Sequence, residues 1–408
     1  MLNQLTEVYT ESDSTGLTNK NKALKRAILT YLDGTGQAPV ADLSKKLNIS
    51  IPKAMALVNG LVGDGLICEN GKLDSSGGRR ASIYSLNADA AYFIGVDVLK
   101  DSVNIGLIDF RKNIVEIKSD IHYTLRNNVA SFNKLVEIIG TFIKQCPAQK
   151  AKIMCIGVNL SGRVNSETGY SYSYFNFKEE PLTTTMEQIF KVPVVVDNDS
   201  RSMAFGEYFF GVVKNEKNIL FINMDYGLGM GIVTDGKIFY GKSGFSGEIG
   251  HIPFFENEII CHCGKKGCLE TEASGYALLR KFKERLSQGS QSQISKKYAD
   301  VDDILLHDIV DAALNEDVLA IELLSEVGEK IGKGVAALVN IFNPELIVLG
   351  GMLSQTGDYV RLPIMTSLNK YSISLVNNDA KLKMSILGKD AGVLGACLIA
   401  RNQVLSIQ

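Results

Sequence analysis

The feature that most constrains this chain is a short stretch rich in cysteine and glycine. Cys261, Cys263 and Cys268 fall within eight positions, and Gly264 and Gly267 separate them. Glycine turns let the backbone fold each sulfur back toward a common point. Three thiolates and one imidazole form the closed tetrahedral shell of a structural zinc site. The stretch therefore predicts a loop that is folded around Zn²⁺.

Two histidines compete for the fourth ligand position. His251 lies ten positions upstream of Cys261, whereas His262 stands between the first two cysteines. Side chains of adjacent residues tend to diverge, so the spacing favours His251. The alternative for the whole stretch is a surface loop with free or disulfide-bonded cysteines. Three cysteines, two turn glycines and a nearby histidine favour a zinc site formed by His251, Cys261, Cys263 and Cys268.

Two carboxylates accompany the predicted zinc site. Glu248 and Glu270 lie on the two arms of the loop that zinc would hold. Carboxylates accept hydrogen bonds from hydroxyl groups, and sugars carry many hydroxyl groups. The metal would keep the two acidic side chains in register. We therefore expect a structural zinc beside a polar pocket for a hydroxyl-rich ligand.

The complete pattern reads GEIGH from Gly247 to His251 and CHCGKKGCLE from Cys261 to Glu270. It resembles the ROK family of sugar kinases and sugar-responsive repressors. The resemblance implies that His251 both holds zinc and touches the sugar, and that Glu248 and Glu270 bind sugar hydroxyls. It spans nearly the whole chain and implies an actin-like ATPase fold, with sugar and nucleotide bound between two lobes.

Length and composition are those of a soluble protein of two or three domains. The chain has 408 residues, of which 45% are hydrophobic and 22% are charged. No apolar run approaches the roughly 18 residues of a membrane helix. The N-terminus has neither the basic nor the apolar region of a secretion signal. We expect a cytoplasmic protein without a membrane partner, and reduced thiols at Cys68, Cys146, Cys155 and Cys397.

Basic residues are concentrated in one N-terminal segment. Residues 20–84 hold ten Lys or Arg against five Asp or Glu, although the whole chain has a formal net charge of −2. Positive charge in one small segment is expected of a region that meets nucleic acid. Residues 1–19 before it are polar and lack helical periodicity, which predicts a flexible arm.

Residues 20–87 have the element order of a winged helix-turn-helix. Apolar spacing predicts a helix from Lys20 to Asp33, a short helix around residues 40–47, and a third helix that Ser50 caps. Two alternating segments then flank a basic loop that ends in Gly-Gly-Arg-Arg. In this arrangement the third helix enters the major groove, and the candidates for DNA contact are Ser50, Lys53, Asn59, Arg79 and Arg80.

The alternative for this segment is a small helical cap that packs on the body of the protein or on a partner protein. The glycine-arginine tip resembles the wing of ROK repressors, and ROK kinases generally lack such a domain. The resemblance therefore favours DNA binding over a protein-binding cap.

The rest of the chain predicts two α/β lobes, at residues 88–205 and 206–408. The first begins with strands at 91–99, 102–109 and 114–123 and continues with a helix at 131–144, strands at 153–159 and 193–196, and a helix at 200–209. The second begins with strands at 219–224, 229–234 and 237–240 and includes a helix at 320–342, a strand at 346–349 and a helix at 391–402. The predicted fold class is α/β: a winged helix-turn-helix followed by a two-lobed, actin-like ATPase body. A cleft between the lobes is where a small ligand would bind.

The triplet Asp197-Asn198-Asp199 follows directly on a buried strand at residues 192–196, so its side chains emerge where α/β sheets bind ligands. The same residues are also what an N-cap of the next helix requires. The resemblance implies that Asn198 binds sugar and that Asp199 corresponds to the general base of the kinases. It also matches Ser161-Gly162 to a sugar-contacting Pro-Gly turn in which Ser161 replaces the proline.

Phosphate binding requires a turn of small residues whose backbone amides converge on the oxygens. ROK kinases carry Asp-x-Gly-Gly-Thr in the first hairpin, where this chain reads DVLKD from Asp97 to Asp101. Bulky side chains do not easily adopt glycine conformations, and Asp101 would repel phosphate. The first phosphate loop is therefore predicted to be lost.

A second loop, at residues 225–231, keeps three glycines of the kinase pattern Gly-Thr-Gly-x-Gly-x-Gly, but it begins with Asp225 and Tyr226. Gly350 and Gly351 match a segment that runs beside adenosine in the kinases. The simpler interpretation, a strand-to-helix turn that needs glycine, is favoured.

These features predict a sugar- or phosphosugar-responsive transcriptional regulator, a repressor of carbohydrate genes. It would descend from a kinase and have no enzymatic activity, with Asp199 as a vestigial base. The expected partners are operator DNA, a small sugar or phosphosugar and, from the family, further copies of the chain in a homodimer or tetramer. The alternatives are an ATP-dependent sugar kinase with an added DNA-binding domain, and a sugar-sensing adaptor whose winged domain binds a protein.

Overall fold

The computed structural model of the protein describes residues 4–9, 16–72, 81–177, 179–298 and 300–405. Within these ranges the chain forms two compact units. The first spans residues 1–160, 168–196 and 396–408, and the second spans 161–167 and 197–395. This division differs from the lobe boundary that we predicted at residue 205. The helix after Asn198 lies in the second unit, and the end of the last helix lies in the first.

The N-terminal part of the first unit has the predicted winged helix-turn-helix order. Its helices are α2 (Gly16–Thr35), α3 (Val40–Leu47) and α4 (Ile51–Gly63), and its strands, in the order β1-β3-β2, are Ala38–Pro39, Ser82–Leu86 and Ile67–Lys72. The buried face of α4 consists of Ala54, Leu57, Val58 and Leu61. The loop tip with Arg79 and Arg80 lies outside the described residues.

A short helix, α1 (Gln4–Tyr9), precedes this domain, where we predicted a flexible arm without helical periodicity. Leu5 and Val8 are buried, and α1 packs against α2. The Arg26 guanidinium of α2 donates a hydrogen bond of 2.7 Å to the Val8 carbonyl. The sequence did not predict this helix because two apolar residues three positions apart are too few to establish a period.

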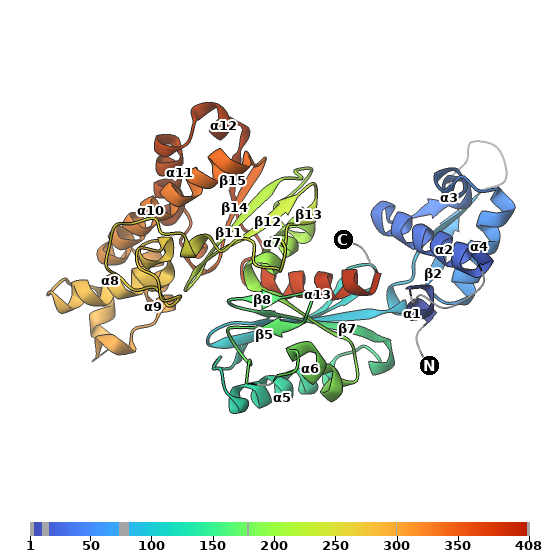
Figure 1. The fold of residues 1–408 in the computed structure, drawn as a ribbon, viewed down its shortest axis with the longest axis horizontal. Helices are drawn as coiled ribbons and strands as arrows, with labels where there is room; N and C mark the ends of the chain where they lie inside the picture. Colours follow the sequence, from blue (N-terminus) through green and yellow to red (C-terminus); the bar gives the residue numbers. More distant parts are fainter. Residues whose placement is uncertain (1–3, 10–15, 73–80, 178, 299, 406–408) are drawn as a thin grey trace. The chain divides into compact units, whose positions relative to one another are not determined.

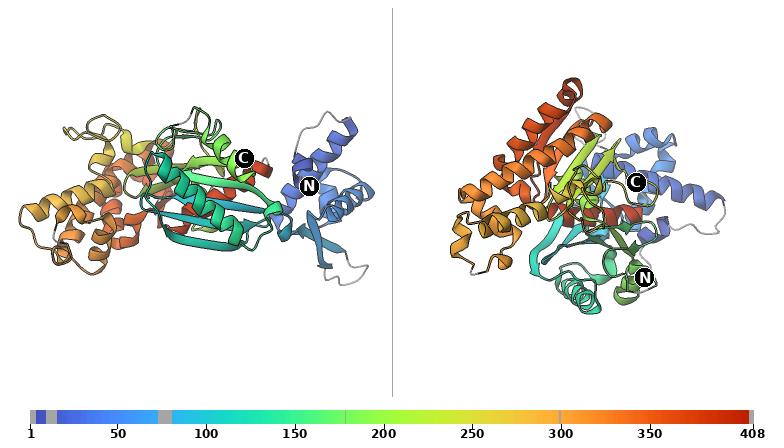
Figure 2. Two further views of the ribbon diagram at one scale, coloured as in Figure 1. Left: turned by 90° about the horizontal axis from the view of Figure 1, so that it is seen from below. Right: turned by 60° about the vertical axis from the view of Figure 1, so that its left-hand side comes forward.

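The first unit also contains a five-stranded sheet in the order β10-β7-β4-β5-β6. The three hairpin strands are β4 (Tyr92–Val98), β5 (Ser102–Asp109) and β6 (Ile114–His122), and β7 (Ile153–Leu160) lies parallel to β4. Every residue of β7 is buried, as expected for a strand covered on both faces. Helices α5 (Val129–Gln145) and α6 (Leu182–Phe190) lie on one face, and the end of α13 (Asp390–Leu405) lies on the other (Figures 1 and 2).

The second unit has a sheet in the order β13-β12-β11-β14-β15. Its strands are β11 (Ile219–Met224), β12 (Leu228–Thr234), β13 (Lys237–Ile238), β14 (Leu346–Gly350) and β15 (Lys381–Met384). In both sheets a three-stranded hairpin series is followed by a strand that lies parallel to its first strand. The topology therefore repeats, as the order of elements in the sequence predicted.

Helices complete the second unit. One group comprises α8 (Gly275–Ser287), α9 (Leu306–Leu314), α10 (Val318–Phe342), α11 (Asp358–Tyr371) and α12 (Ser374–Asp379). The buried side of α10 and the apolar residues of β11, β12 and β14 form one core with α8, α9 and α11. Helix α7 (Asp199–Phe210) packs directly against β12. No helix among the described residues is both long and apolar enough to cross a bilayer.

Short elements connect these layers. They are β8 (Val164–Asn165), β9 (Tyr170–Ser171) and the 3-10 turns η1 (Ala88–Ala90), η2 (Lys150–Lys152), η3 (Ile249–His251), η4 (Leu269–Thr271), η5 (Gln293–Lys296), η6 (Val301–Asp303) and η7 (Met352–Thr356). Strand β10 (Val194–Asn198) is not a connection but the edge strand of the first sheet, beside β7.

Helix α13 takes part in both units. In the second unit it crosses α7 so closely that a Cβ atom on Gly395 would lie 1.8 Å from the Ser202 carbonyl oxygen. In the first unit its buried Arg401 donates hydrogen bonds to the Phe110 carbonyl at 3.1 Å and to Asp33 at the end of α2. Lys112 also lies 3.0 Å from Asp33. The winged domain is therefore joined to the first sheet through buried or partly buried charges.

Candidate metal centre and ligand pocket

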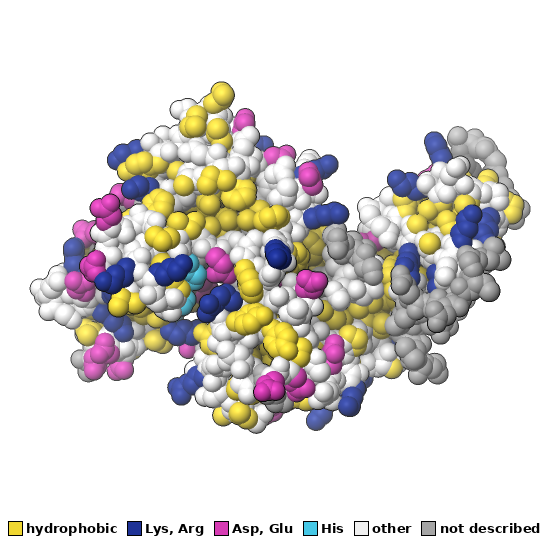
Figure 3. Space-filling view, in the orientation of Figure 1, with side chains coloured by type: hydrophobic (Ala, Val, Ile, Leu, Met, Phe, Trp, Pro, Cys, Tyr) yellow, Lys and Arg dark blue, Asp and Glu magenta, His cyan; other side chains and the backbone are white. Residues whose placement is uncertain are grey.

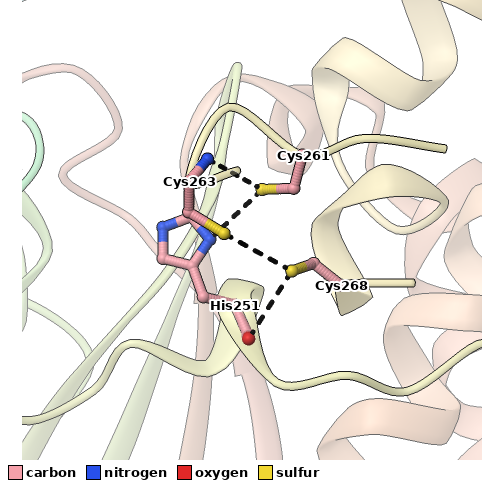
Figure 4. Close-up of side chains that lie close together, drawn as sticks. All are labelled: His251, Cys261, Cys263 and Cys268. Carbon is pink, nitrogen blue, oxygen red and sulfur yellow. Dashed lines mark hydrogen bonds between the residues drawn. The ribbon is translucent and has the colours of Figure 1, made fainter. Parts of the chain in front are cut away.

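Four donor groups converge at the cysteine-rich loop of the second unit. The sulfurs of Cys261, Cys263 and Cys268 and a ring nitrogen of His251 all lie within 4.8 Å of one another. The Cys263 and Cys268 sulfurs are 3.6 Å apart, and His251 Nδ1 lies 3.5 Å from the Cys261 sulfur (Figure 4). Tetrahedral zinc with Zn–S bonds of 2.3 Å separates two sulfurs by about 3.8 Å. The residues and their spacing therefore fit a structural zinc ion.

The backbone of the loop has the turns that the glycines predicted. Gly264 and Gly267 have φ angles of +87° and +70°, in the left-handed region. The Cys261 amide donates to the Lys265 carbonyl at 2.8 Å, and the Gly264 amide donates to the Cys261 carbonyl at the same distance. A Cβ atom on Gly267 would lie 2.1 Å from the Phe255 carbonyl oxygen. These contacts hold the three sulfurs on one side of the loop.

His262 occupies a different position from His251. Its side chain is exposed, and its Nδ1 lies 2.7 Å from Glu270 Oε1 and 4.0 Å from the Cys261 sulfur. His251, His262 and Glu270 form a second group of possible metal ligands that shares His251 with the first. The group with three sulfurs matches zinc better, because zinc prefers thiolate and imidazole ligands in closed structural sites.

The two predicted carboxylates border His251. Glu248 Oε2 lies 3.7 Å from His251 Nε2, and Glu270 Oε1 lies 3.7 Å from His251 Nδ1. Burial raises the pKa of Glu248, and His251 opposes this effect. Burial is also the largest single effect on Glu270, but the hydrogen bonds with His262 and Cys261 and the charges of His262 and His251 together outweigh it, so the pKa of Glu270 is lowered. On the molecular surface, histidine side chains are seen beside acidic and basic ones (Figure 3).

The second predicted group of ligand residues also comes together. The Ser161 hydroxyl donates to Asp199 Oδ2 at 2.7 Å, and the Asn198 amide donates to the Gly162 carbonyl at 3.1 Å and to Asp199 Oδ1 at 2.9 Å. Asn198 also caps α7, because its side-chain oxygen accepts a hydrogen bond from the Arg201 amide. Burial raises the pKa of Asp199. The cap and the polar cluster therefore coexist in the same residues.

Arg201 lies beside both groups, and the sequence analysis did not identify it. Its side chain is 1% exposed, and it contributes to the electrostatic environment of both Asp199 and Glu248. Arg163 also acts on Glu248. A single arginine in the first turn of a helix has no spacing signature. Arg201 could have been found from its position two residues after the predicted ligand residue Asp199, because a charged residue is unexpected in a helix of mostly small and apolar residues.

The segment that corresponds to the first kinase phosphate loop is an ordinary hairpin turn. Asp97 and Val98 are buried, and the Leu99 amide donates to the Ser102 carbonyl at 3.0 Å. None of the residues from Asp97 to Asp101 has a positive φ angle. The turn therefore lacks the backbone conformation of a glycine-rich anion cradle.

In the second loop, Asp225 accepts a hydrogen bond from the Tyr226 amide at 2.7 Å. Burial raises the pKa of Asp225, and hydrogen bonds from the Tyr226 and Met352 amides oppose this effect. The glycines have packing roles, since a Cβ atom on Gly229 would lie 2.1 Å from Ser200 Oγ and one on Gly231 would lie 2.4 Å from the Ala204 Cβ atom. These glycines allow α7 to approach β12.

The three described candidates for DNA contact lie on or beside α4. Ser50 and Asn59 are exposed, and Ser50 occupies the N-cap position without making a side-chain capping hydrogen bond. The Lys53 ammonium group donates to Asn21 of α2 at 2.7 Å. Arg79 and Arg80 lie outside the described residues.

Comparisons with known proteins extend these observations. The model of the ROK family matches residues 93–403. The xylose repressor of Caldicellulosiruptor bescii is 31% identical over 89% of this chain and 92% of its own length. The glucokinase of Halalkalibacterium halodurans is 31% identical over 78% of this chain and 97% of its own length. The transcriptional dual regulator NagC of Escherichia coli is 29% identical over 93% of each chain.

Solved structures of ROK family proteins are also similar to this chain. A ROK family transcriptional regulator, a homologue of the Mlc protein of Escherichia coli, has a TM-score of 0.77 and 28% identity and covers 95% of this chain and 97% of its own. A ROK family glucokinase from Streptomyces griseus, in complex with glucose and AMPPNP, has a TM-score of 0.66 and 28% identity and covers 76% of this chain and 100% of its own. By the extent of these matches, the chain belongs to the ROK family.

Proposed function

We propose that this protein is a DNA-binding transcriptional regulator, a repressor of carbohydrate genes that responds to a sugar or phosphosugar. The observation that carries the proposal is the combination of a winged helix-turn-helix domain with a body whose phosphate loops are altered. The full-length similarity to a xylose repressor and to NagC supports it. We also propose that it acts in the cytoplasm, where operator DNA and sugars are available.

The proposed effector pocket consists of residues that offer hydroxyl-binding groups, namely Ser161, Gly162, Asn198, Asp199, Glu248, His251 and Glu270. Carboxylate, amide and hydroxyl oxygens can bind the many hydroxyl groups of a sugar, and their placement selects among stereoisomers. The hydrogen bonds from Ser161 and Asn198 to Asp199 support this assignment, because they fix the carboxylate in one orientation.

Zinc would be held in this protein by His251, Cys261, Cys263 and Cys268. A closed shell of three thiolates and one imidazole supplies structural stabilisation and leaves no position open for a reacting group. Because His251 is a ligand and also lies beside Glu248 and Glu270, the metal site would set the orientation of the pocket.

The proposed DNA-binding surface comprises Ser50, Lys53 and Asn59 on the third helix and Arg79 and Arg80 at the wing. The domain would bind as part of a homodimer or tetramer, since two winged domains read two half-sites. We propose that effector binding changes the separation of the two winged domains and so weakens operator binding.

A sugar kinase is the second candidate. Asn198 and Asp199 are retained, and the body is 31% identical to a glucokinase. We propose that the catalytic activity is lost. The first phosphate loop has become a hairpin turn with buried Val98, and the second presents a carboxylate, Asp225, where phosphate would lie.

A thermal-shift screen would test both candidates together. The purified protein is heated with D-xylose, D-glucose, N-acetyl-D-glucosamine and 6-phosphosugars, each with and without magnesium-ATP. A ligand that binds only the folded state raises the Tm. We expect one sugar or phosphosugar to raise the Tm and ATP to have no effect. Stabilisation by ATP would contradict the loss of kinase activity.

The wild-type protein and the variant E248A then separate effector binding from DNA binding. DNA duplexes are selected by the wild-type protein from a random pool. E248A should keep the wild-type affinity for the selected duplex and lose the response to the sugar. The exposed Glu258, which pairs with Lys266 outside the pocket, provides the control variant E258A. Loss of DNA binding by folded E248A would contradict the proposal.

A further inference from the structure

Arg201 is the largest fully buried side chain of the second unit, and it carries a charge. It stands in the first turn of α7, two residues after Asp199. A buried guanidinium group is strongly destabilising unless its donors are paired. The identity of its partners therefore shows which segments the protein holds together at this point.

The charge of Arg201 is balanced by Asp197. The Asp197 Oδ1 atom accepts hydrogen bonds from Arg201 Nε at 2.7 Å and lies 2.6 Å from Nη2. The Tyr240 hydroxyl donates to Asp197 Oδ2 at 3.0 Å, and the Tyr240 ring lies 5.5 Å from the guanidinium carbon. Both charged side chains are 1% exposed, so the pair is desolvated and compensated within the protein.

The remaining donors of Arg201 reach two backbone carbonyls on separate segments. Nη1 donates to the Gly244 carbonyl, and Nη2 donates to the Val164 carbonyl at 3.3 Å. A Cβ atom on Gly244, whose φ angle is +77°, would lie 3.2 Å from the same Val164 oxygen. The two segments therefore approach each other at the guanidinium group, at a position that requires glycine.

Each of the three contacts lies close in the sequence to a residue of the proposed pocket. Val164 ends the turn that contains Ser161 and Gly162. Asp197 directly precedes Asn198 and Asp199, and Gly244 begins the segment that leads to Glu248. The Arg201 side chain thus connects every segment of the proposed pocket except the cysteine-rich loop, which carries Glu270.

We propose that Arg201 is the positioning residue of the effector pocket: its buried guanidinium group sets the spacing of the Ser161-Gly162 turn, the Asn198-Asp199 pair and the segment that carries Glu248. This inference rests on the proposed function, because it takes the pocket as an effector site. Arg201 does not reach the ligand in this account. It acts through the backbone carbonyls and through Asp197.

The electrostatics of the pocket agree with this role. Burial raises the pKa of Asp199, and the Arg201 guanidinium group opposes this effect. The buried cation therefore favours the ionised form of a carboxyl group that would accept hydrogen bonds from sugar hydroxyls.

Three variants test the proposal. R201M removes all donors at similar side-chain length and leaves Asp197 as an unpaired buried charge. R201K keeps the charge, but one ammonium group cannot reproduce the planar fork that reaches two carbonyls and a carboxylate. D197N/R201M removes both charges, so it lifts the cost of the unpaired carboxylate while the Gly244 and Val164 carbonyls still lack their donor.

The measurements are the Tm, the Kd and amide exchange. Calorimetry with D-xylose, D-glucose, N-acetyl-D-glucosamine and their phosphates first identifies a probe that the wild type binds. We expect D197N/R201M to regain most of the Tm that R201M loses, yet to bind the probe about 10- to 100-fold more weakly than the wild type. R201K should also fail to restore the affinity. Amides of residues 161–166 and 242–248 should exchange faster in all three variants, while β11 and β14 keep their protection.

The outcomes separate this inference from the proposed function. If D197N/R201M shows the wild-type affinity and the wild-type exchange at both segments, Arg201 is only a partner for Asp197 and the inference is wrong. If the wild type binds none of the probes, the proposed function is contradicted. Amide exchange in the three variants still decides whether Arg201 holds the two segments, because it requires no ligand.

Discussion

Asp199 combines two requirements at the level of a single residue. As the first residue of α7 it accepts a hydrogen bond from the Ser200 amide, and as a residue of the proposed pocket it accepts one from the Ser161 hydroxyl. A carboxylate at the start of a helix is favoured by the helix dipole. Burial nevertheless dominates, and the pKa of Asp199 is raised.

This shift predicts a pH-dependent effect of the variant D199N. The folded state holds the Asp199 proton more tightly than the unfolded chain does, so ionisation lowers the free energy of unfolding as pH rises from 3.8 through the raised pKa. The D199N side chain does not ionise, so this decrease in the free energy of unfolding is absent in the variant. We expect D199N to have a higher Tm than the wild type above this pH window and no higher Tm below it. A difference in Tm that stays constant from acid to neutral pH would be inconsistent with the raised pKa.

The sequence identified some of the residues around the proposed pocket and missed others. Asn198, Asp199 and Ser161 were identified because each lies in a motif with a fixed spacing, and their side chains lie together in the structure. Their binding of sugar remains a prediction. Arg201 was missed, since its partners Gly244 and Val164 are backbone groups that no sequence pattern marks. Lys53 was predicted to contact DNA, and its hydrogen bond to Asn21 depends on the packing of α2 against α4.

At the level of elements, the cysteine-rich loop predicts that thermal stability depends on bound zinc. C263S should contain less zinc than the wild type and unfold at a lower temperature. Loss of a structural metal removes about 3 kcal/mol or more of stability, which for a unit of this size lowers the Tm by roughly 6 °C or more. Zinc content by atomic absorption and Tm with and without a chelator are the measurements. C68S, in the winged domain, is the control and should keep its zinc.

The close crossing of α7 and α13 predicts that one added methyl group lowers the Tm strongly. G395A places a Cβ atom where the Ser202 backbone lies, 1.8 Å from its carbonyl oxygen, so the two helices must separate. G140A in the middle of α5 is the matched control, because nothing lies within 4 Å of its Cβ position. We expect G395A to lower the Tm, and G140A to raise stability by up to about 1 kcal/mol through helix propensity. Similar Tm values for the two variants would contradict this packing.

The sequence predicted the bounds of helices and strands better than the contacts that these elements make with one another. The β5 and β11 strands have the predicted bounds, and the last helix was predicted within a few residues of its ends. Local periodicity is enough for such elements. The sequence did not predict that α13 belongs to two units, because its contacts with α2 and α7 join residues far apart in the chain.

For the whole molecule, the salt dependence of DNA binding separates a repressor from a protein-binding adaptor. Each phosphate contact that is lost reduces the slope of log K against log salt concentration by about 0.9. R79A/R80A should therefore weaken binding to the selected duplex and lower the slope by about 2 if both arginines contact phosphate. The exposed pair Lys134 and Glu137 on α5 offers the control variant K134A. An unchanged slope in R79A/R80A would favour the adaptor.

The shared helix α13 also affects how the protein is made. Residues 396–405 complete the first unit, whose other segments all precede residue 197. A ribosome therefore finishes the second unit's sequence before it supplies the last part of the first. Arg401 can join Asp33 only after the sequence of the second unit has been synthesised. Until then the winged domain has the Lys112–Asp33 ion pair but not the Arg401 contact, so the last turns of α13 complete its attachment to the first sheet.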